Sequence, residues 1–210
     1  MKIVVSYISS LFSVKKTINM INETSANGIH VDLMDGKYVG NLNFDENLFE
    51  VLKEAKLPLD VHAMVLDPEN YLDKIIALKP DCVYIHAKTT KEIKTIFEKL
   101  RINGIKRGLA INPEEDITLY EELYSDVDRI LVMSVNPGKG GQSFLENTPF
   151  KLEELSKLKE QYNFSIYVDG GINDDTIKFV SKYADGVVSG SFICKSEDYE
   201  NQIEKLRLSL

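Results

Sequence analysis

The chain alternates short β-rich runs with amphipathic helical patterns along its whole length, and this alternation restricts the fold more than any other feature. It requires parallel strands joined by right-handed helical crossovers. The 210 residues supply about 26 residues for each of eight strand and helix pairs, which is close to the minimum for a (β/α)8 barrel. We predict eight strands: Lys2–Ile8, Gly28–Met34, Leu59–Val65, Cys82–His86, Lys106–Ile111, Arg129–Val135, Ser165–Val168 and Gly186–Ser189.

The apolar residues between these runs recur at intervals of three and four, which is the spacing of a helix buried on one side. Examples lie in residues 47–52, 93–100 and 152–158. No linker rich in proline or glycine divides the chain, so we expect an α/β fold in which residues 1–210 form a single (β/α)8 TIM barrel domain. Strand counting leaves an open, doubly wound sheet as the alternative.

The positions of the polar residues favour the closed barrel over the open sheet. They stand at or near the ends of successive predicted strands, and a closed barrel would gather these ends around one mouth, where barrel enzymes place their chemistry. The residues concerned are His30, Asp32, His62, His86, Asn112, Asn136 and Asp169.

The composition narrows the range of partners and compartments. The formal net charge of -8 argues against binding to nucleic acid, which requires clustered basic surface. No apolar run approaches the roughly 18 residues of a membrane span, and the N-terminal segment lacks the cleavage site of a signal peptide. Cys82 and Cys194 lie in separate apolar stretches, as expected of buried free thiols in a reducing compartment. We therefore expect a soluble protein of the cytoplasm, with neither nucleic acid nor a membrane as partner.

His30 and Asp32 are two residues apart on one predicted strand, so their side chains project from the same face. His62 stands near the end of the next predicted strand. Imidazole and carboxylate groups that converge on one point can share a metal ion, but a core histidine beside a strand-end aspartate would have the same pattern. The residues leave both interpretations open, and the similar setting of all three histidines favours a site.

Glycine-rich segments follow three of the later predicted strands, at residues 136–142, 169–173 and 190–191. Glycine allows backbone N–H groups to approach an anion, and a helix beginning after Gly170 and Gly171 would favour negative charge there. On one rim of a barrel, the three loops would form a cradle for a phosphate group. The alternatives are an ordinary turn at residues 169–171 and a flexible lid for the longest loop, and a lid is compatible with phosphate binding.

Three further features are expected to be structural. Cys82 lies beside apolar residues and is expected to pack in the core. Tyr120 and Tyr124 are four residues apart, which predicts a packing stripe on a helix. The charged run at residues 153–160 is expected to be the solvated face of another helix.

Together these motifs resemble the ribulose-phosphate 3-epimerases, a family of metal-dependent (β/α)8 barrels with close relatives that act on allulose 6-phosphate. The resemblance covers nearly the whole chain, and its motifs occur in the family's order, which is more specific than any single motif. The matching segments are His30–Gly36, Asp60–Val65, Gly108–Pro113, Val132–Gly138, Gly140–Gln142, Val168–Ile172 and Gly190–Ser191.

The resemblance implies one divalent metal ion, with Zn2+, Fe2+, Mn2+ and Co2+ all suitable. The implied ligands are His30, Asp32, His62 and Asp169. Asp32 and Asp169 would also be the catalytic acid and base. The implied substrate contacts are Ser6, His62, Gly140, Gly141, Gln142, Ser143, Gly170, Gly171, Gly190 and Ser191, and Met34, Met64 and Met133 match methionines that line the family's metal site.

This chain departs from the family pattern around the expected mouth. Residues 37–41 are Lys-Tyr-Val-Gly-Asn where the family usually has His-Phe-Val-Pro-Asn, and Lys139 stands where an aromatic residue is usual. The first strand continues as Ile-Ser-Ser-Leu at residues 8–11, unlike the usual Leu-Ser-Ala-Asp-like sequence. None of these differences removes an implied ligand, but they change the surface around the sugar.

The activity implied by the resemblance is 3-epimerisation of a ketose phosphate through an enediolate. The first hypothesis is interconversion of D-ribulose 5-phosphate and D-xylulose 5-phosphate in pentose phosphate metabolism, and the alternative is D-allulose 6-phosphate or a similar ketohexose phosphate. The implied partner is a small sugar phosphate, and a homo-oligomer is expected.

Two other classes of function are less consistent with the motifs. A non-catalytic phosphosugar-binding barrel would have no use for both carboxylates and both histidines. A metal-free lyase or decarboxylase would usually need a lysine at the catalytic strand ends, and none stands beside Asp32 or Asp169.

Overall fold

The computed structural model describes residues 1–210, and its centre is a closed barrel of eight parallel strands. Each strand pairs with its neighbours in chain order, and β8 closes the barrel against β1. The single (β/α)8 TIM barrel is thus confirmed, and the open sheet is wrong. The strands are β1 Lys2–Ser6, β2 Gly28–Met34, β3 Leu59–Met64, β4 Cys82–His86, β5 Lys106–Ile111, β6 Arg129–Met133, β7 Ser165–Asp169 and β8 Gly186–Ser189.

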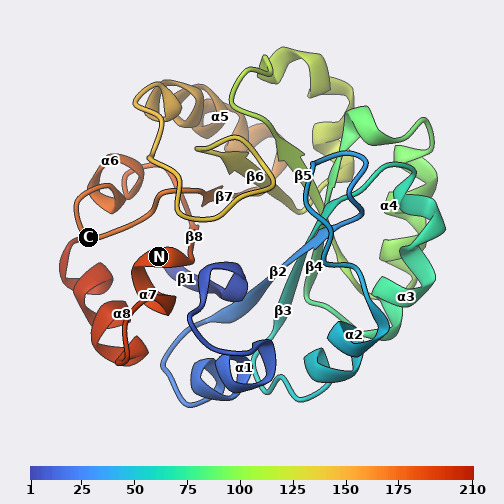
Figure 1. Ribbon diagram of the computed structural model, residues 1–210. Helices are drawn as coiled ribbons and strands as arrows, with labels where there is room; N and C mark the ends of the chain where they lie inside the picture. The colour runs from blue at the N-terminus through green and yellow to red at the C-terminus, as the bar shows by residue number, and fades with distance from the viewer.

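Helices surround the barrel on the outside, as Figure 1 shows. The α-helices are α1 Val14–Asn22, α2 Glu46–Leu52, α3 Leu72–Ala77, α4 Ile93–Ile102, α5 Thr148–Tyr162, α6 Ile177–Val180, α7 Ser191–Cys194 and α8 Tyr199–Leu208. The 3-10 helices are η1 Tyr7–Ser9, η2 Pro68–Asn70, η3 Ala87–Thr89 and η4 Ile117–Asp126. None of the helices combines the length and the apolar character that crossing a membrane would require.

The predicted strands are all present; β2, β4, β5 and β8 have the predicted bounds, and the other four end one or two residues away from the predicted end. β1 stops at Ser6, two residues early, because the Ser6 hydroxyl accepts a hydrogen bond from the backbone of Ile8 and caps η1. β6 likewise stops at Met133, whereas β7 extends one residue further, to Asp169. These strands therefore end close to the polar residues at the mouth of the barrel.

Most structural expectations outside the strands are also confirmed, with one correction. Cys82 and Cys194 are both buried free thiols. Tyr120 and Tyr124 are both buried in the core, but they lie in the 3-10 helix η4 instead of an α-helix. The side chain of Asp116 accepts a hydrogen bond from the backbone of Thr118 and caps this helix.

The alternation of side chains along the strands separates two cores. Residues that face outward pack against the helices in one large cluster, which takes Ile29, Val31 and Leu33 from β2. Residues that face inward form a second apolar cluster inside the barrel: Val4, Cys82, Tyr84, Ala110, Leu131, Met133, Val135, Tyr167 and Val188. On β2 and β3, the inward positions include the polar residues His30, Asp32, Asp60 and His62.

The barrel interior also contains an ion pair. The guanidinium of Arg129 donates from Nη1 to both carboxylate oxygens of Asp60, at 2.9 and 3.0 Å, and Nη2 donates to Asp81. The side chains of Arg129 and Asp60 are each only 5% exposed. Arg129 also lies 4.7 Å from the ring centroid of Tyr167, so charged and aromatic groups fill the space that a purely apolar core would occupy.

Candidate active site

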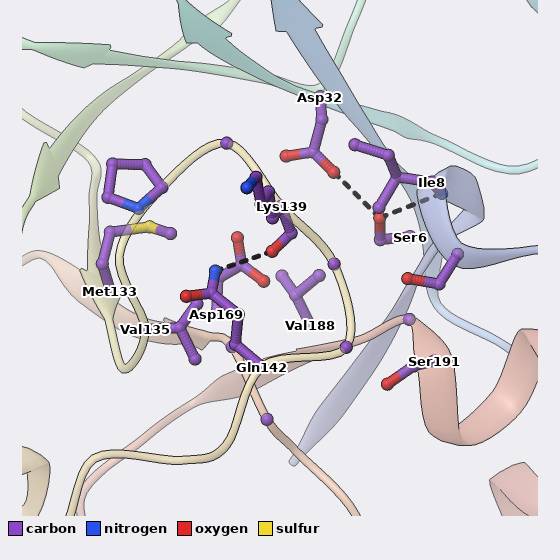
Figure 2. A pocket seen from close by; sticks show the side chains of 18 of the residues that line it. Ser6, Ile8, Asp32, Met133, Val135, Lys139, Gln142, Asp169, Val188 and Ser191 are labelled. Atoms are coloured by element: carbon purple, nitrogen blue, oxygen red, sulfur yellow. Dashed lines mark hydrogen bonds between the residues drawn. The ribbon is translucent and has the colours of Figure 1, made fainter. Parts of the chain in front are cut away.

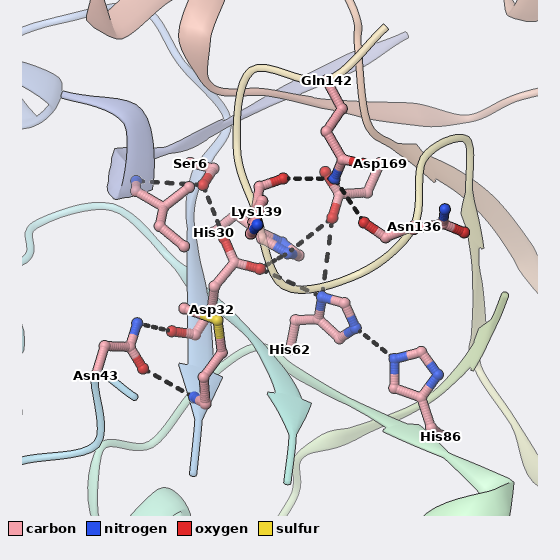
Figure 3. Close-up of polar contacts among 12 residues, drawn as sticks. Ser6, His30, Asp32, Asn43, His62, His86, Asn136, Lys139, Gln142 and Asp169 are labelled. Atoms are coloured by element: carbon pink, nitrogen blue, oxygen red, sulfur yellow. Dashed lines mark hydrogen bonds and ion pairs between the residues drawn. The ribbon is translucent and has the colours of Figure 1, made fainter. Parts of the chain in front are cut away.

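Four side chains converge at the mouth of the barrel, where the strands end. His30 and Asp32 come from β2, His62 from β3 and Asp169 from β7. Asp32 pairs in register with His62 across the sheet, and Figure 3 shows the side chains turned toward one another. Each offers one ligand atom, and these atoms all lie within 4.8 Å of one another. The structure therefore brings together every residue predicted to hold the metal.

The distances within this cluster suit a bound ion better than direct hydrogen bonds. Nε2 of His30 is 3.5 Å from Oδ1 of Asp32 and 3.6 Å from Oδ2 of Asp169. Nδ1 of His62 is 3.3 and 3.8 Å from the same two oxygens. These ring nitrogens are buried without a hydrogen-bond partner.

Four ligands bonded to a tetrahedral ion at about 2.1 Å would be about 3.4 Å apart, close to the separations in the cluster. Two imidazoles and two carboxylates are also an accepted donor set for Zn2+ and similar first-row divalent ions. The residues present thus fit the implied metal.

Polar contacts hold Asp32 and the end of β2 in place. The hydroxyl of Ser6 donates to Oδ2 of Asp32 at 2.9 Å. The side chain of Asn43 donates from Nδ2 to the Asp32 carbonyl at 2.7 Å and accepts from the backbone of Met34 at 2.8 Å. Ser6 was expected at the site from the resemblance, but Asn43 was missed, because it lies in a loop outside any pattern and only the fold shows its contacts.

His86 is a second residue whose role the sequence did not assign. It ends β4, and its Nε2 lies 2.8 Å from Nε2 of His62. Its place near a strand end was recognised, and its position two residues after Tyr84 on β4 was a signal that it faces inward. Burial and the neighbouring charge of His62 hold the pKa of His86 well below its usual range. His86 is therefore a neutral ring beside the cluster.

The two carboxylates of the cluster have different acid strengths. Burial acts to raise the pKa of Asp32, but the neighbouring His30 and His62 outweigh it and hold that pKa well below the usual range. Burial and the negative charge of Asp32 raise the pKa of Asp169. The pKa values of these two carboxyl groups are thereby moved apart. The environment favours the ionised form of Asp32, which suits a base, whereas Asp169 more readily holds a proton.

The cluster also changes the protonation of His30. Burial acts against a charged imidazole, but the carboxylates of Asp32, Asp169 and Asp60 more than offset this effect and raise the pKa of His30 to about 9. In the absence of a metal ion, a proton on His30 thus partly neutralises the paired carboxylates.

Asp32 and Asp169 line a cavity at the mouth of the barrel. In Figure 2, the loop that carries Lys139 and Gln142 arches over this cavity. The expected substrate contacts in its wall are Ser6, Gly140, Gly141, Gln142, Gly170, Gly171, Gly190 and Ser191.

Some residues implied by the resemblance lie outside this wall. Ser143 is exposed and is not part of the lining, and His62 faces the metal-site cluster without lining the cavity. Met64 and Met133 line the cavity, whereas Met34 does not.

Glycine is required where the loops approach one another. Gly171 has a φ of +64°, and a Cβ there would lie 2.5 Å from the backbone nitrogen of Phe144. A Cβ on Gly140 would overlap the side chain of Ser9. A helix follows the glycine pair as expected, but α6 begins only at Ile177, because the side chain of Asn173 accepts backbone hydrogen bonds and forms a turn first.

The loop after β6 is fastened over the cavity by hydrogen bonds. The side chain of Gln142 donates to the carbonyls of Asn136 and Lys139, at 2.6 and 2.8 Å. Across the mouth, Nδ2 of Asn41 donates to the carbonyl of Gly138 at 2.5 Å. Lys139 stays exposed on this loop while also lining the cavity. The loops after β2 and β6 therefore meet above the site.

Together, the fold and the cluster define a (β/α)8 barrel with a two-histidine, two-carboxylate site at the carboxyl ends of its strands. Residues 2–194 match the model of the ribulose-phosphate 3 epimerase family. The chain is 37% identical to the ribulose-phosphate 3-epimerase of Helicobacter pylori (strain ATCC 700392 / 26695), with 99% of this chain and 97% of that protein covered. The identity with the Bacillus subtilis (strain 168) ribulose-phosphate 3-epimerase is 30%, with 98% of each covered. The chain belongs to the ribulose-phosphate 3 epimerase family and is an isomerase of the epimerase class.

The barrel is also similar to solved structures outside this family. Thiamine phosphate pyrophosphorylase from Pyrococcus furiosus superposes with a TM-score of 0.69 over 99% of this chain and 94% of that one. The sequence identity is only 20%, so this likeness concerns the fold alone.

Proposed function

We propose that this chain is a metal-dependent 3-epimerase of a ketose phosphate, with D-ribulose 5-phosphate and D-xylulose 5-phosphate as its two substrates. The observation that carries the proposal is the convergence of Asp32 and Asp169, which line a cavity rimmed by glycine loops, with the two buried histidines His30 and His62. The names of the relatives support the choice of sugar.

Epimerisation next to a ketone removes a weakly acidic C–H proton and returns a proton to the opposite face. In the proposed mechanism, ionised Asp32 removes the proton in one direction, and Asp169 supplies one from the other face. The roles exchange in the reverse reaction. The different pKa directions of the two carboxylates support this division of labour, since one is held ionised and the other is shifted toward the protonated form.

His30, Asp32, His62 and Asp169 would hold the metal ion. When bound, a divalent ion supplies Lewis-acid stabilisation for the negative charge that develops on the enediolate oxygens. The donor set suits Zn2+, Fe2+, Mn2+ and Co2+ alike. Ser6 orients Asp32 through its 2.9 Å hydrogen bond, so the base is directed before substrate enters.

The glycine loops would bind the phosphate group. Gly140, Gly141, Gly170, Gly171 and Gly190 line the same cavity as the two carboxylates. Backbone N–H groups of such loops can approach an anion closely, because no Cβ intervenes. Binding the phosphate at a distance from the reacting carbon would hold that carbon between the two carboxylates.

Purified protein loaded separately with each of the four metals tests the proposal. D-ribulose 5-phosphate and D-allulose 6-phosphate are supplied to parallel samples, and the products are followed by NMR. We expect conversion of ribulose 5-phosphate to xylulose 5-phosphate in at least one metal-loaded sample and none after chelation. Faster turnover of allulose 6-phosphate would transfer the assignment to a ketohexose phosphate, and turnover of neither sugar would contradict the proposal.

A further inference from the structure

His86 and His62 form a pair of buried rings behind the metal-site cluster. Their Nε2 atoms are 2.8 Å apart, and both residues are completely buried. The ring centroids are 5.0 Å apart, and the ring planes are tilted by 34°. Figure 3 shows His62 between His86 on one side and the two carboxylates on the other. Nε2 of His62 thus faces His86, and Nδ1 faces the carboxylates.

Nδ1 of His62 is the nitrogen on the metal side. It lies 3.3 Å from Oδ1 of Asp32 and has no hydrogen-bond partner. A nitrogen that binds a metal must carry no proton, and a neutral imidazole carries a single proton. Once Nδ1 binds the metal, the proton of His62 is on Nε2. His62 is then the donor in the pair, and Nε2 of His86 is the acceptor.

His86 has no competing hydrogen bond from its ring. Its Nδ1 is buried without a partner, so it gives no hydrogen-bond preference to either tautomer. The His86 ring packs against Tyr38, with 5.1 Å between centroids, and Asn112 donates to the Tyr38 hydroxyl at 2.8 Å. The hydroxyl of Thr89 donates to the His86 carbonyl, also at 2.8 Å. The contact with Tyr38 thus holds the His86 ring beside His62, whereas Thr89 contacts only the backbone of His86.

We propose that His86 is a positioning residue of the metal site. Its Nε2 accepts a hydrogen bond from the Nε2–H group of His62, and this bond directs the Nδ1 lone pair of His62 toward the metal ion. The inference rests on the proposed metal site. His86 itself is outside the group of residues whose ligand atoms converge, so it acts through His62. Contacts of this kind typically change metal affinity by about 10- to 100-fold.

Two substitutions at His86 separate the hydrogen bond from the packing. His86→Gln keeps an acceptor near the position of Nε2, and His86→Leu removes it while leaving an apolar side chain. Zn2+ affinity is measured by competition with a chromogenic chelator, beside thermal unfolding of each metal-free protein. We expect His86→Leu to bind Zn2+ about 10- to 100-fold more weakly and His86→Gln to recover most of the loss.

Thr89→Val is the matched control. It removes the hydrogen bond to the His86 carbonyl but leaves the pair of rings intact, so its Zn2+ affinity should equal that of the wild type. Equal affinity of His86→Leu and the wild type would overturn the inference alone. Failure of the wild type to bind any of the four metals would overturn the proposed metal site and the inference with it.

A spectroscopic measurement tests the tautomers without any substitution. The chain has only three histidines, so 15N-histidine NMR of the zinc-loaded protein reports each ring separately. We expect a proton on Nε2 of His62 and on Nδ1 of His86. A proton on Nε2 of His86 would make it the donor and would overturn the inference, even if the His86→Leu protein does not fold.

Discussion

Asp32 and Asp169 carry the same chemical group, but their surroundings shift their pKa values in opposite directions. Asp32 accepts a hydrogen bond from Ser6 and lies beside both histidines of the cluster. Asp169 lies near the same histidines, and the charge of Asp32 opposes its ionisation. At the scale of single residues, the chemistry therefore depends on which neighbours each carboxylate has.

Replacing each aspartate by asparagine should separate the two proton transfers. Asp169→Asn should lower epimerisation by about 10²- to 10⁴-fold, because a proton carrier is lost. If Asp32 still removes the proton, this variant in D2O should exchange deuterium into one epimer without forming the other. Asp32→Asn should show exchange only in the opposite epimer. NMR of both sugars measures turnover and exchange together.

Metal content must be measured beside the exchange, since both aspartates are also proposed ligands. A variant that has lost its metal gives no information on proton transfer. Near-normal epimerisation by either metal-replete variant would contradict the two-carboxylate mechanism.

His30 predicts a pH dependence of metal binding. Its pKa of about 9 in the metal-free protein means that it is protonated at neutral pH, whereas a ligating nitrogen must be free of protons. Zn2+ binding at pH 7.5 should therefore release about one proton from His30, and this release should disappear as the pH rises above about 9. Calorimetry in buffers of different ionisation enthalpy measures the release. A proton release that does not change between these pH values would contradict the assignment.

At the scale of an element, the loop after β6 lies over the site and carries Lys139, where the resemblance implies an aromatic residue. Gln142 fastens the loop to itself, and Asn41 fastens it to the loop after β2. Lys139 is exposed on this loop and makes no salt bridge, so its charge is available to an anion in the cavity.

Lys139→Ala should raise KM more than it lowers kcat. The substitution removes a positive charge from the cavity proposed to hold the phosphate but leaves both carboxylates in place. Steady-state kinetics with the preferred sugar phosphate measure the two constants separately. Lys157→Ala, on an exposed face of α5, is a matched control and should change neither constant. A collapse of kcat at unchanged substrate affinity would show that Lys139 takes part in the chemistry.

At the scale of the whole molecule, a buried ion pair lies within the barrel below the site. Arg129 from β6 and Asp60 from β3 join opposite parts of the sheet. A buried charge that loses its partner is strongly unfavourable, because it has left water without a compensating interaction. This ion pair thus links β3 and β6, two strands that are distant in sequence, and the free energy of unfolding depends on both partners.

Arg129→Met should lower the free energy of unfolding by about 3–5 kcal/mol at neutral pH. The loss should be smaller when Asp60→Asn is added, since the unpaired charge is then absent. Burial already raises the pKa of Asp60, so its folded form binds a proton more readily than its unfolded form, and the deficit of Arg129→Met should shrink as the pH falls. Urea unfolding at several pH values measures this. An equal loss in the single and double variants would contradict the explanation.

Several elements were predictable because their signals are local. The strand from Gly28 to Met34 was predicted with its observed bounds, and its alternation placed His30 and Asp32 on one face. By contrast, the start of α6 at Ile177 depends on a side-chain turn at Asn173, and the apolar pattern does not distinguish the 3-10 form of η4 from an α-helix. At Asn173, hydrogen bonds between a side chain and the nearby backbone delay the helix.

The sequence by itself determined the alternation of strands and helices and the side chains that share one face of a strand, because side-chain periodicity along a strand or helix is set by backbone geometry. Only the tertiary structure decided which nitrogen of His62 faces the carboxylates, that His86 lies 2.8 Å from the other, and that Asn43 holds the end of β2. Hydrogen bonds and pKa values depend on distances of a few ångströms between atoms far apart in the chain, and no repeating pattern encodes such distances.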